Sequence, residues 1–311
     1  MKIEAAVTIF SGFVESGKTT SLLGTLERIK DLSEGKSLVI CTEEGEVEYP
    51  VEALKSLNVE VVYLEEEEDL NLEFLKEMDE KYQPADVYIE FNGMWDLREF
   101  IKKELPEEWV FTNIFAMVDG TTYDLYLQNM RQVIMNPLAV ANVILFNRCS
   151  EDFSKAKARR ALKILNPSAE IFFTRLDGSV DYGLEELEMQ DQEGVYHIVD
   201  EIFCSWFVDC LEHADKYYGK RVNFRGVVTR GEGLGEGEFY VGRYAAICCP
   251  EDAQFVGFIA KYNGPSPKNA SWVQVQGQLA KGEINGNKEV IFLLIESLQA
   301  ADQPHDIFLY F

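Results

Sequence analysis

The sequence predicts an α/β domain with a mainly parallel sheet, followed by a small all-β domain. In the first part, short apolar runs alternate with amphipathic helical patterns, which is typical of βαβ units. Later, short strand patterns follow one another with Gly- and Asn-rich turns between them, which indicates a small OB-like barrel. We therefore expect an α/β domain at 1–180, a linker at 181–200, and a helix plus small β-barrel domain at 201–311.

The first domain should contain six strands separated by helices. The apolar runs lie at 5–10, 37–41, 59–64, 85–91, 113–119 and 141–146. Helical patterns follow at 20–26, 51–57 and 70–81. Because the runs are almost continuously apolar, we expect a sheet that is covered on both faces.

The second domain should begin with a helix near 202–218, after a charged connector at 176–194. The expected barrel strands lie at 221–229, 238–248, 254–262, 272–279 and 289–299, with an edge strand at 305–311. No helical pattern separates these strands, which favours an all-β arrangement.

Residues 12–19 read Gly-Phe-Val-Glu-Ser-Gly-Lys-Thr and fit the phosphate-binding pattern G-x-x-x-x-G-K-[ST]. The pattern follows an apolar strand and opens a helix, so backbone N–H groups and the helix N-terminus should converge on phosphate oxygens. We expect this segment to make the chain a P-loop NTPase that binds a nucleoside triphosphate. The expected nucleotide-binding residues here are Gly12, Glu15, Ser16, Gly17, Lys18, Thr19 and Thr20.

Lys18, Glu90 and Gly93 are expected to act in catalysis, and Thr19 is expected to bind the metal. Lys18 should reach the β- and γ-phosphates, and the Thr19 hydroxyl should bind Mg²⁺. Glu90 ends an apolar strand, where ligands bind in open α/β sheets, and we expect it to help hold Mg²⁺. Gly93 follows three residues later and should sense the γ-phosphate.

Net charge, hydropathy and cysteine content indicate which partners and which cellular compartment to expect. The formal net charge of −25 argues against nucleic acid or an anionic membrane as a partner. No apolar run is long enough to span a bilayer, so we expect no direct membrane insertion. Six cysteines lack the spacing of a disulfide scaffold, and the N-terminus leads directly into a strand without a signal peptide. We expect a reduced, cytoplasmic protein.

The first domain resembles the CobW/HypB/UreG class of P-loop GTPases over residues 3–180. The matching segments are 12–20, 42–46, 90–93, 118–119 and 165–169. Segment 42–46 is similar to that family's Asn-Glu-Phe-Gly-Glu switch, and 90–93 is similar to its Glu-Ser/Thr-x-Gly. The resemblance implies GTP hydrolysis with Mg²⁺ and a role in metal delivery or metal homeostasis. It also implies that Glu43 and Glu46 are switch residues near the metal, and it allows a nucleotide-linked homodimer.

The base-recognition segment departs from the family pattern Asn-Lys-x-Asp, because it reads Asn147-Arg148-Cys149-Ser150. Asn147 fits, and the Arg148 stem can cover the base as Lys does. The Ser150 hydroxyl cannot offer the charged, bidentate acceptor of a carboxylate, unless Glu151 or Asp152 takes over that role. The resemblance implies GTP, while ATP stays open.

The family's Cys-x-Cys-Cys metal motif is also missing. No cysteine lies between Cys41 and Cys149, and the comparable region, 64–70, is an acidic run. Such a run could hold a hard cation, but charge runs are more often solvated loops.

The other metal candidates are Cys248, Cys249 and Asp252 in the second domain. Two thiols and a carboxylate at a turn suit Zn²⁺ or another transition metal. One buried and one incidental cysteine is an equally good interpretation. Residues 215–311 are similar to the soluble domain of a bacterial family that is paired with a permease, which implies a permease component or a metal-dependent client as partner.

Three functions remain in view from the sequence. The first is a Mg²⁺-dependent NTPase, with GTP as the implied substrate, that drives metal delivery or a partner's conformational change. The second is a nucleotide-binding regulatory or scaffold protein with negligible turnover, which the altered Ser150 position favours. The third is a metal-sensing module that uses Cys248 and Cys249.

Overall fold

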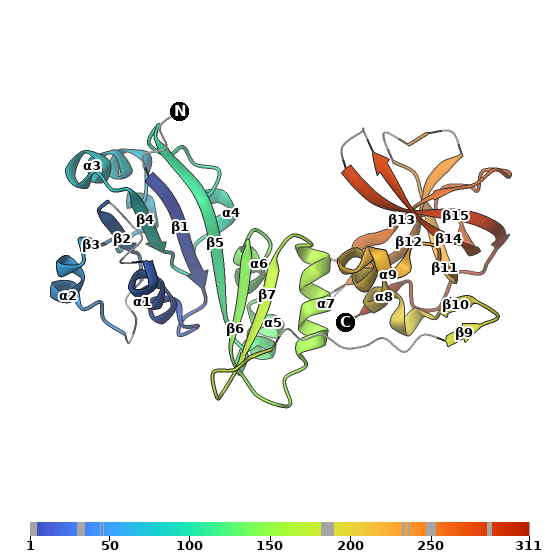
Figure 1. Cartoon of the computed structure of the whole chain (residues 1–311), viewed down its shortest axis with the longest axis horizontal. Helices are drawn as coiled ribbons and strands as arrows, with labels where there is room; N and C mark the ends of the chain where they lie inside the picture. The colour runs from blue at the N-terminus through green and yellow to red at the C-terminus, as the bar shows by residue number, and fades with distance from the viewer. Residues whose placement is uncertain are drawn as a thin grey trace. The chain divides into compact units, whose positions relative to one another are not determined.

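The computed structural model describes residues 5–29, 35–43, 45, 47–181, 190–231, 234–235, 237–246, 253–284 and 288–310. The chain divides into two compact units (Figure 1). The first comprises Met1–Lys155 and Leu165–Leu184, and the second comprises Ala156–Ile164 and Glu185–Phe311. Within the described ranges, no helix is long and apolar enough to cross a membrane.

The first unit is built on an eight-stranded sheet in the order β3-β2-β4-β1-β5-β6-β7-β8. Its strands are β1 (Ala5–Gly12), β2 (Ser37–Cys41), β3 (Val59–Tyr63), β4 (Asp86–Glu90), β5 (Trp109–Asp119), β6 (Val143–Cys149), β7 (Glu170–Arg175) and β8 (Val180–Asp181). All neighbours are parallel except β7 and β8. The predicted α/β class with a mainly parallel sheet is confirmed.

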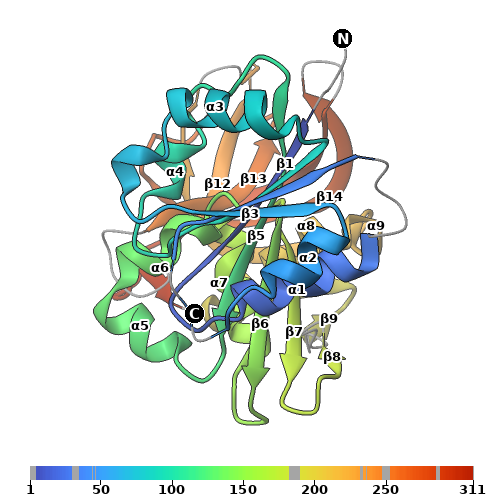
Figure 2. The same ribbon diagram turned by 90° about the vertical axis from the view of Figure 1, so that its left-hand side faces the viewer.

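Helices connect these strands and cover the sheet. They are α1 (Lys18–Ile29), α2 (Val51–Ser56), α3 (Leu72–Tyr82), α4 (Leu97–Phe100), α5 (Tyr123–Asn129) and α6 (Arg131–Leu138), with a 3-10 turn at Glu67–Asp69. Leu22 and Leu26 of α1 and Leu54 of α2 share one apolar cluster with Val39 and Tyr88 of the sheet. Figure 2 shows α1 and α2 side by side in front of the strands. The 3.6-residue period of α1 thus places its apolar face on the sheet.

The second unit contains a closed, five-stranded barrel. Its elements are α7 (Lys155–Leu165), β9 (Gln190–Gln192), β10 (Val195–Ile198), α8 (Asp200–Glu212), α9 (Ala214–Tyr217), β11 (Arg221–Thr229), β12 (Glu238–Ala246), β13 (Gln254–Lys261), β14 (Trp272–Ile284), β15 (Lys288–Ala300) and β16 (Phe308–Tyr310). The strands β12, β13, β15, β14 and β11 are neighbours in that order, and β11 pairs back with β12. The predicted small all-β, OB-like barrel is confirmed.

Aromatic side chains of the barrel strands pack against α8. Trp206 of α8 is fully buried and lies 5.6 Å, between ring centroids, from Phe224 of β11 and 5.2 Å from Phe258 of β13. Ile164 of α7 belongs to the same cluster. The helix predicted near 202–218 therefore contributes α8, and its Trp206 ring packs against aromatic side chains of the barrel.

Two short strands lie inside the segment that the sequence analysis assigns to a linker. β10 pairs in parallel with β11, and β9 pairs antiparallel with β10. The described part of 190–198 thus extends the second unit's sheet rather than standing apart from it. At the other end of that sheet, β16 pairs with β12 as an edge strand.

Candidate functional site

The phosphate loop connects β1 directly to α1, and its backbone requires glycine at both ends. Gly12 has φ 147° and Gly17 has φ 93°, in the left-handed half of conformational space that favours glycine. A Cβ on Gly12 would lie 2.2 Å from the Met117 carbonyl oxygen, and one on Gly17 would lie 2.7 Å from Asn147 Nδ2. The loop therefore forms a tight cradle against the ends of β5 and β6.

The cradle also holds a polar group without a partner. Ser16 is 1% exposed, and its hydroxyl meets no hydrogen-bond partner among the described residues. A buried, unpaired hydroxyl costs free energy unless a ligand satisfies it. Glu15, which precedes Ser16, and Thr20, in the first turn of α1, are exposed. Together with the open backbone of a loop at a helix N-terminus, Ser16 fits a bound phosphate.

Lys18 reaches back over the loop. Its ammonium group donates to the carbonyl oxygens of Gly12, at 2.9 Å, and Phe13, at 3.0 Å. It also lies 2.7 Å from Glu43 Oε2. That contact is an ion pair whose direction does not suit a hydrogen bond, because Glu43 Oε2 has no hydrogen-bond partner among the described residues. Lys18 is therefore positioned as the cation of the phosphate cradle.

Thr19 and Glu90 meet at the expected metal position. The Thr19 hydroxyl donates to Glu90 Oε1 at 2.6 Å, and Glu90 is 3% exposed. Its other oxygen, Oε2, accepts a hydrogen bond from the Tyr49 hydroxyl and lies 3.9 Å from Cys41 Sγ. A hydroxyl beside a buried carboxylate is the oxygen-rich donor set that Mg²⁺ prefers, so these residues fit the ion.

The sequence analysis did not single out Tyr49. This residue is buried between α1 and the sheet. Burial, with the neighbouring Glu90 carboxylate, raises the pKa of Tyr49 far above its usual range, so the hydroxyl keeps its proton and acts as donor. Burial likewise raises the pKa of the Cys41 thiol to about 11, partly offset by its hydrogen bond to the Glu43 carbonyl. Both groups are neutral neighbours of Glu90.

Gly93 lies directly on the phosphate loop. A Cβ at this position would lie 2.1 Å from the Gly12 carbonyl oxygen and 2.9 Å from Phe13 Cα. Between Glu90 and Gly93, Asn92 is fixed by a hydrogen bond from its backbone N–H to Thr42 Oγ1, at 2.8 Å. The segment after β4 thus contacts both the phosphate loop and the start of the β2–α2 loop.

The base-recognition segment closes over the same loop from β6. Asn147 Nδ2 donates to the Ser16 carbonyl oxygen at 2.7 Å. Arg148, which has φ 54°, donates from Nη2 to the Glu15 carbonyl oxygen and lies 2.6 Å from Asp119 Oδ2. Burial of Asp119 opposes its ionisation, but hydrogen bonds from Arg148 and Thr121 hold its pKa below the usual value. Arg148 is thereby held across the loop.

Ser150 supplies no charge to this region. Its carbonyl oxygen accepts from the Phe153 N–H at 3.3 Å and from Lys155 Nζ at 3.5 Å. Glu151 and Asp152, the alternatives considered from the sequence, are both exposed. The structure therefore places Asn147 and Arg148 on the phosphate loop, and it places no carboxylate from 150–152 against them in a described contact.

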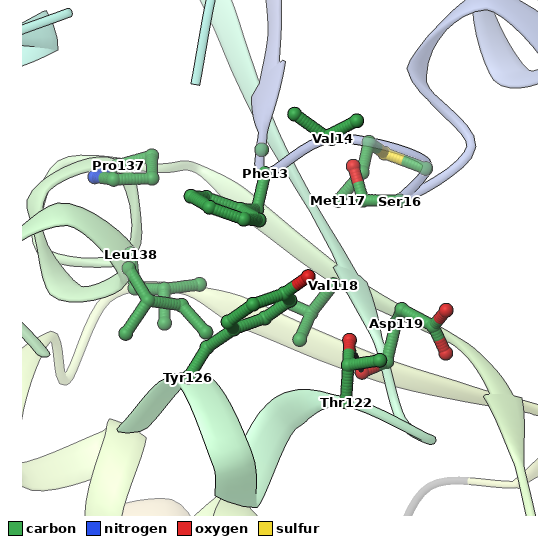
Figure 3. Close-up of a pocket in the computed structure, with 12 residues that line it drawn as sticks. Phe13, Val14, Ser16, Met117, Val118, Asp119, Thr122, Tyr126, Pro137 and Leu138 are labelled. Carbon is green, nitrogen blue, oxygen red and sulfur yellow. Dashed lines mark hydrogen bonds between the residues drawn. The ribbon is translucent and has the colours of Figure 1, made fainter. Parts of the chain in front are cut away.

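Two hollows flank the loop. A slot of about 10 Å³ lies under it, where the Phe13 ring faces the Tyr126 ring of α5 at 4.3 Å between centroids (Figure 3). On the other side, a cleft of about 890 Å³ is lined by Thr19, Cys41, Thr42, Glu43, Gly45, Val47, Glu48, Tyr49, Val51, Tyr63, Leu64, Glu65 and Asn92. The larger hollow includes Thr19, so this cleft opens at the expected metal position, beside the β2–α2 loop.

The expected transition-metal residues are not tested by these contacts. Cys248, Cys249, Asp252 and Glu46 lie outside the described residues. In the part of the chain that is described, no group of three His, Cys, Asp or Glu side chains is arranged to hold a metal ion. The acidic run at 65–69 is mostly exposed, in keeping with a solvated loop.

Solved structures with a similar fold include HypB from Archaeoglobus fulgidus, at 17% identity and TM-score 0.38, covering 56% of this chain and 83% of that one. Zn(II)-bound YjiA GTPase from E. coli matches at 17% identity and TM-score 0.41, covering 97% of this chain and 91% of that one. HypB from Helicobacter pylori in complex with nickel matches at 15% identity and TM-score 0.32, covering 55% of this chain and 78% of that one. No curated protein matches the chain.

Two family matches together cover most of the chain. Residues 179–311 match the DUF1980 C-terminal domain. Residues 6–173 match the CobW/HypB/UreG nucleotide-binding domain, and this segment contains the phosphate loop, Glu90 and Asn147. Because that match spans more than half of the sequence, the chain belongs to the CobW/HypB/UreG family of P-loop, GTPase-like nucleotide-binding proteins, with a DUF1980 C-terminal domain behind it.

Proposed function

We propose that the chain is a Mg²⁺-dependent nucleoside triphosphatase that takes GTP. The observation that carries the proposal is the meeting of Lys18, Thr19 and Glu90 at the carboxyl end of the sheet, beside a cradle with an unpaired Ser16 hydroxyl. Lys18 and the loop N–H groups would hold phosphate oxygens, and Thr19 with Glu90 would hold Mg²⁺. When bound, the ion neutralises charge on the phosphates.

The chain's own residues position the phosphate loop. Gly93 packs on Gly12, so a change in the segment after Glu90 reaches the phosphate loop through direct backbone contact. Asn147 and Arg148 fix the loop's carbonyl groups and leave the Arg148 stem half exposed for a base to cover. The choice of GTP rather than ATP as the nucleotide rests on family membership, since Ser150 lacks the carboxylate that recognises guanine.

Phosphate release tests the proposal. Lys18→Ala should abolish release from GTP, while Lys102→Ala, which removes an exposed lysine paired with Glu99, should leave it unchanged. Equal rates for wild type and Lys18→Ala would refute hydrolysis at this site. Calorimetry with GTP, GDP and ATP in Mg²⁺ separates the alternative, a scaffold with tight nucleotide binding and negligible turnover, which the neutral Ser150 favours.

We further propose that hydrolysis serves metal delivery. Support comes from family membership, since the resemblance extends to metallochaperones, and from the two thiols and carboxylate at Cys248, Cys249 and Asp252. Metal analysis of wild type and of Cys248→Ser/Cys249→Ser after loading with Zn²⁺ checks this. Stoichiometric Zn²⁺ in the wild type alone supports it, and equal metal content in both proteins removes these ligands from the proposal.

A further inference from the structure

We propose that Glu43 determines how strongly the site prefers a nucleoside diphosphate over the triphosphate, by occupying the side of Lys18 that a γ-phosphate requires. The inference rests on the proposed nucleotide site and assigns Glu43 a role other than Mg²⁺ ligation. Its basis is the Lys18–Glu43 pair, at 2.7 Å between Nζ and Oε2, in a region where both side chains are almost fully covered.

Lys18 has one direction left for an anion. An ammonium group has three donors, and the Gly12 and Phe13 carbonyl oxygens take two of them. The Glu43 carboxylate lies 2.7 Å from the same ammonium group, as its ion-pair partner. In phosphate loops of this pattern, the lysine reaches the β- and γ-phosphates while the loop N–H groups cradle the α- and β-phosphates. The Glu43 carboxylate therefore stands where terminal phosphate charge is needed.

Glu43 has little else to satisfy it. Its Oε2 is buried and meets no hydrogen-bond donor among the described residues, although Lys18 supplies a positive charge. A buried charge that loses its partner is strongly destabilising. A third phosphate must therefore displace the carboxylate into solvent or be repelled by it, whereas a diphosphate can occupy the loop amides while the pair persists.

The loop that carries Glu43 is attached on both sides. Thr42 donates from its hydroxyl to the Glu90 carbonyl oxygen at 2.9 Å, and Tyr49 donates to the Glu90 carboxylate. Gly45 lies close to Thr19, since a Cβ there would lie 3.8 Å from Thr19 Oγ1. Thr42 and Tyr49 are thus both held at Glu90, while Glu43 itself lines the cleft of about 890 Å³.

Calorimetry of GDP and of a non-hydrolysable GTP analogue separates this role from metal binding. We compare wild type, Glu43→Gln and the control Glu48→Gln, which removes a charge from the same cleft. Each is measured in EDTA and in Mg²⁺. Without Mg²⁺, Glu43→Gln should bind the analogue at least about tenfold more tightly, with GDP affinity changed less than about twofold, and Glu48→Gln should show neither effect.

Each other outcome overturns the inference in a recognisable way. An unchanged ratio of analogue to GDP affinity refutes it. Weaker analogue binding by Glu43→Gln in Mg²⁺ alone would make Glu43 a metal ligand instead. If wild type binds neither nucleotide, the proposed function itself fails. A second variant, Glu43→Ala, must change the ratio in the same direction as Glu43→Gln, and thermal unfolding of both variants shows whether they are folded.

Discussion

The Tyr49 hydroxyl donates a hydrogen bond to Glu90 Oε2, on the opposite side of the carboxylate from Thr19. Both oxygens of this buried acid therefore accept from donors, Thr19 in the first turn of α1 and Tyr49 in the loop before α2. The arrangement fixes the orientation of Glu90.

Tyr49→Phe should destabilise the first unit by about 1–3 kcal/mol, because a buried carboxylate oxygen loses its donor. It should also raise the Mg²⁺ concentration needed for half-maximal phosphate release. Denaturant unfolding and a Mg²⁺ titration measure the two effects. Tyr63→Phe is the matched control, since Tyr63 lines the same cleft but is 54% exposed. Equal effects of the two variants would contradict the role of the Tyr49 hydroxyl.

Gly93→Ala should abolish nucleotide binding, because its Cβ would lie 2.1 Å from the Gly12 carbonyl oxygen and would displace the phosphate loop. The backbone at this contact has no flexible side chain that could move aside. Gly24→Ala is the control, since a Cβ there meets nothing within 4 Å. In the interior of α1 it should stabilise the protein by about 0.5–1 kcal/mol. Calorimetry and thermal unfolding check both variants, and nucleotide binding by Gly93→Ala would argue against the contact.

Ser150→Asp should raise the ratio of GTP to ATP affinity, because it restores a charged, bidentate acceptor beside Asn147 and Arg148. A good bidentate contact to a base is worth about 1–3 kcal/mol of discrimination, so the ratio should rise by about tenfold. Ser154→Asp introduces the same charge at an exposed position nearby and should leave the ratio unchanged. A ratio that stays constant in Ser150→Asp would show that guanine is read elsewhere.

The described thiols should resist alkylation at pH 8. Burial raises the pKa of Cys41 and of Cys149 to about 11 and that of Cys204 to about 12, and Cys210 lies well above its usual value. A raised pKa keeps a thiol protonated and unreactive until the pH approaches that value. Iodoacetamide labelling followed by mass spectrometry should therefore place any modification at Cys248 or Cys249. Label on Cys41 in the folded protein would contradict its burial.

Local patterns predicted the loop between β1 and α1 well, because its geometry depends on neighbours in sequence. Gly12 and Gly17 lie where the spacing placed them, and Lys18 opens α1. Strand alternation and turns likewise predicted the class of the sheet and the barrel, although the sheet has eight strands instead of the six expected, with β7 and β8 in addition. These features follow from short-range periodicity and from the conformational freedom of glycine.

Contacts that depend on the path of a loop could not be predicted in this way. Tyr49 resembles any aromatic residue before a helix, and its bond to Glu90 exists only because β2 and β4 are neighbours in the sheet. The Lys18–Glu43 pair similarly joins residues whose roles had been assigned separately to phosphate and metal. A sequence pattern lists donors and acceptors, but the fold decides which of them satisfy one another.

The pairing of β12 has a consequence for the cysteine pair that follows it. Ala245 pairs with Gln254 of β13, and Ala246 pairs with Tyr310 of β16, so both ends of the intervening connection are tied to neighbouring strands. Closing that loop costs no further chain entropy once the barrel has folded. An ion bound within it would favour the folded barrel by mass action. The melting temperature of the second unit should therefore rise when a metal ion binds there.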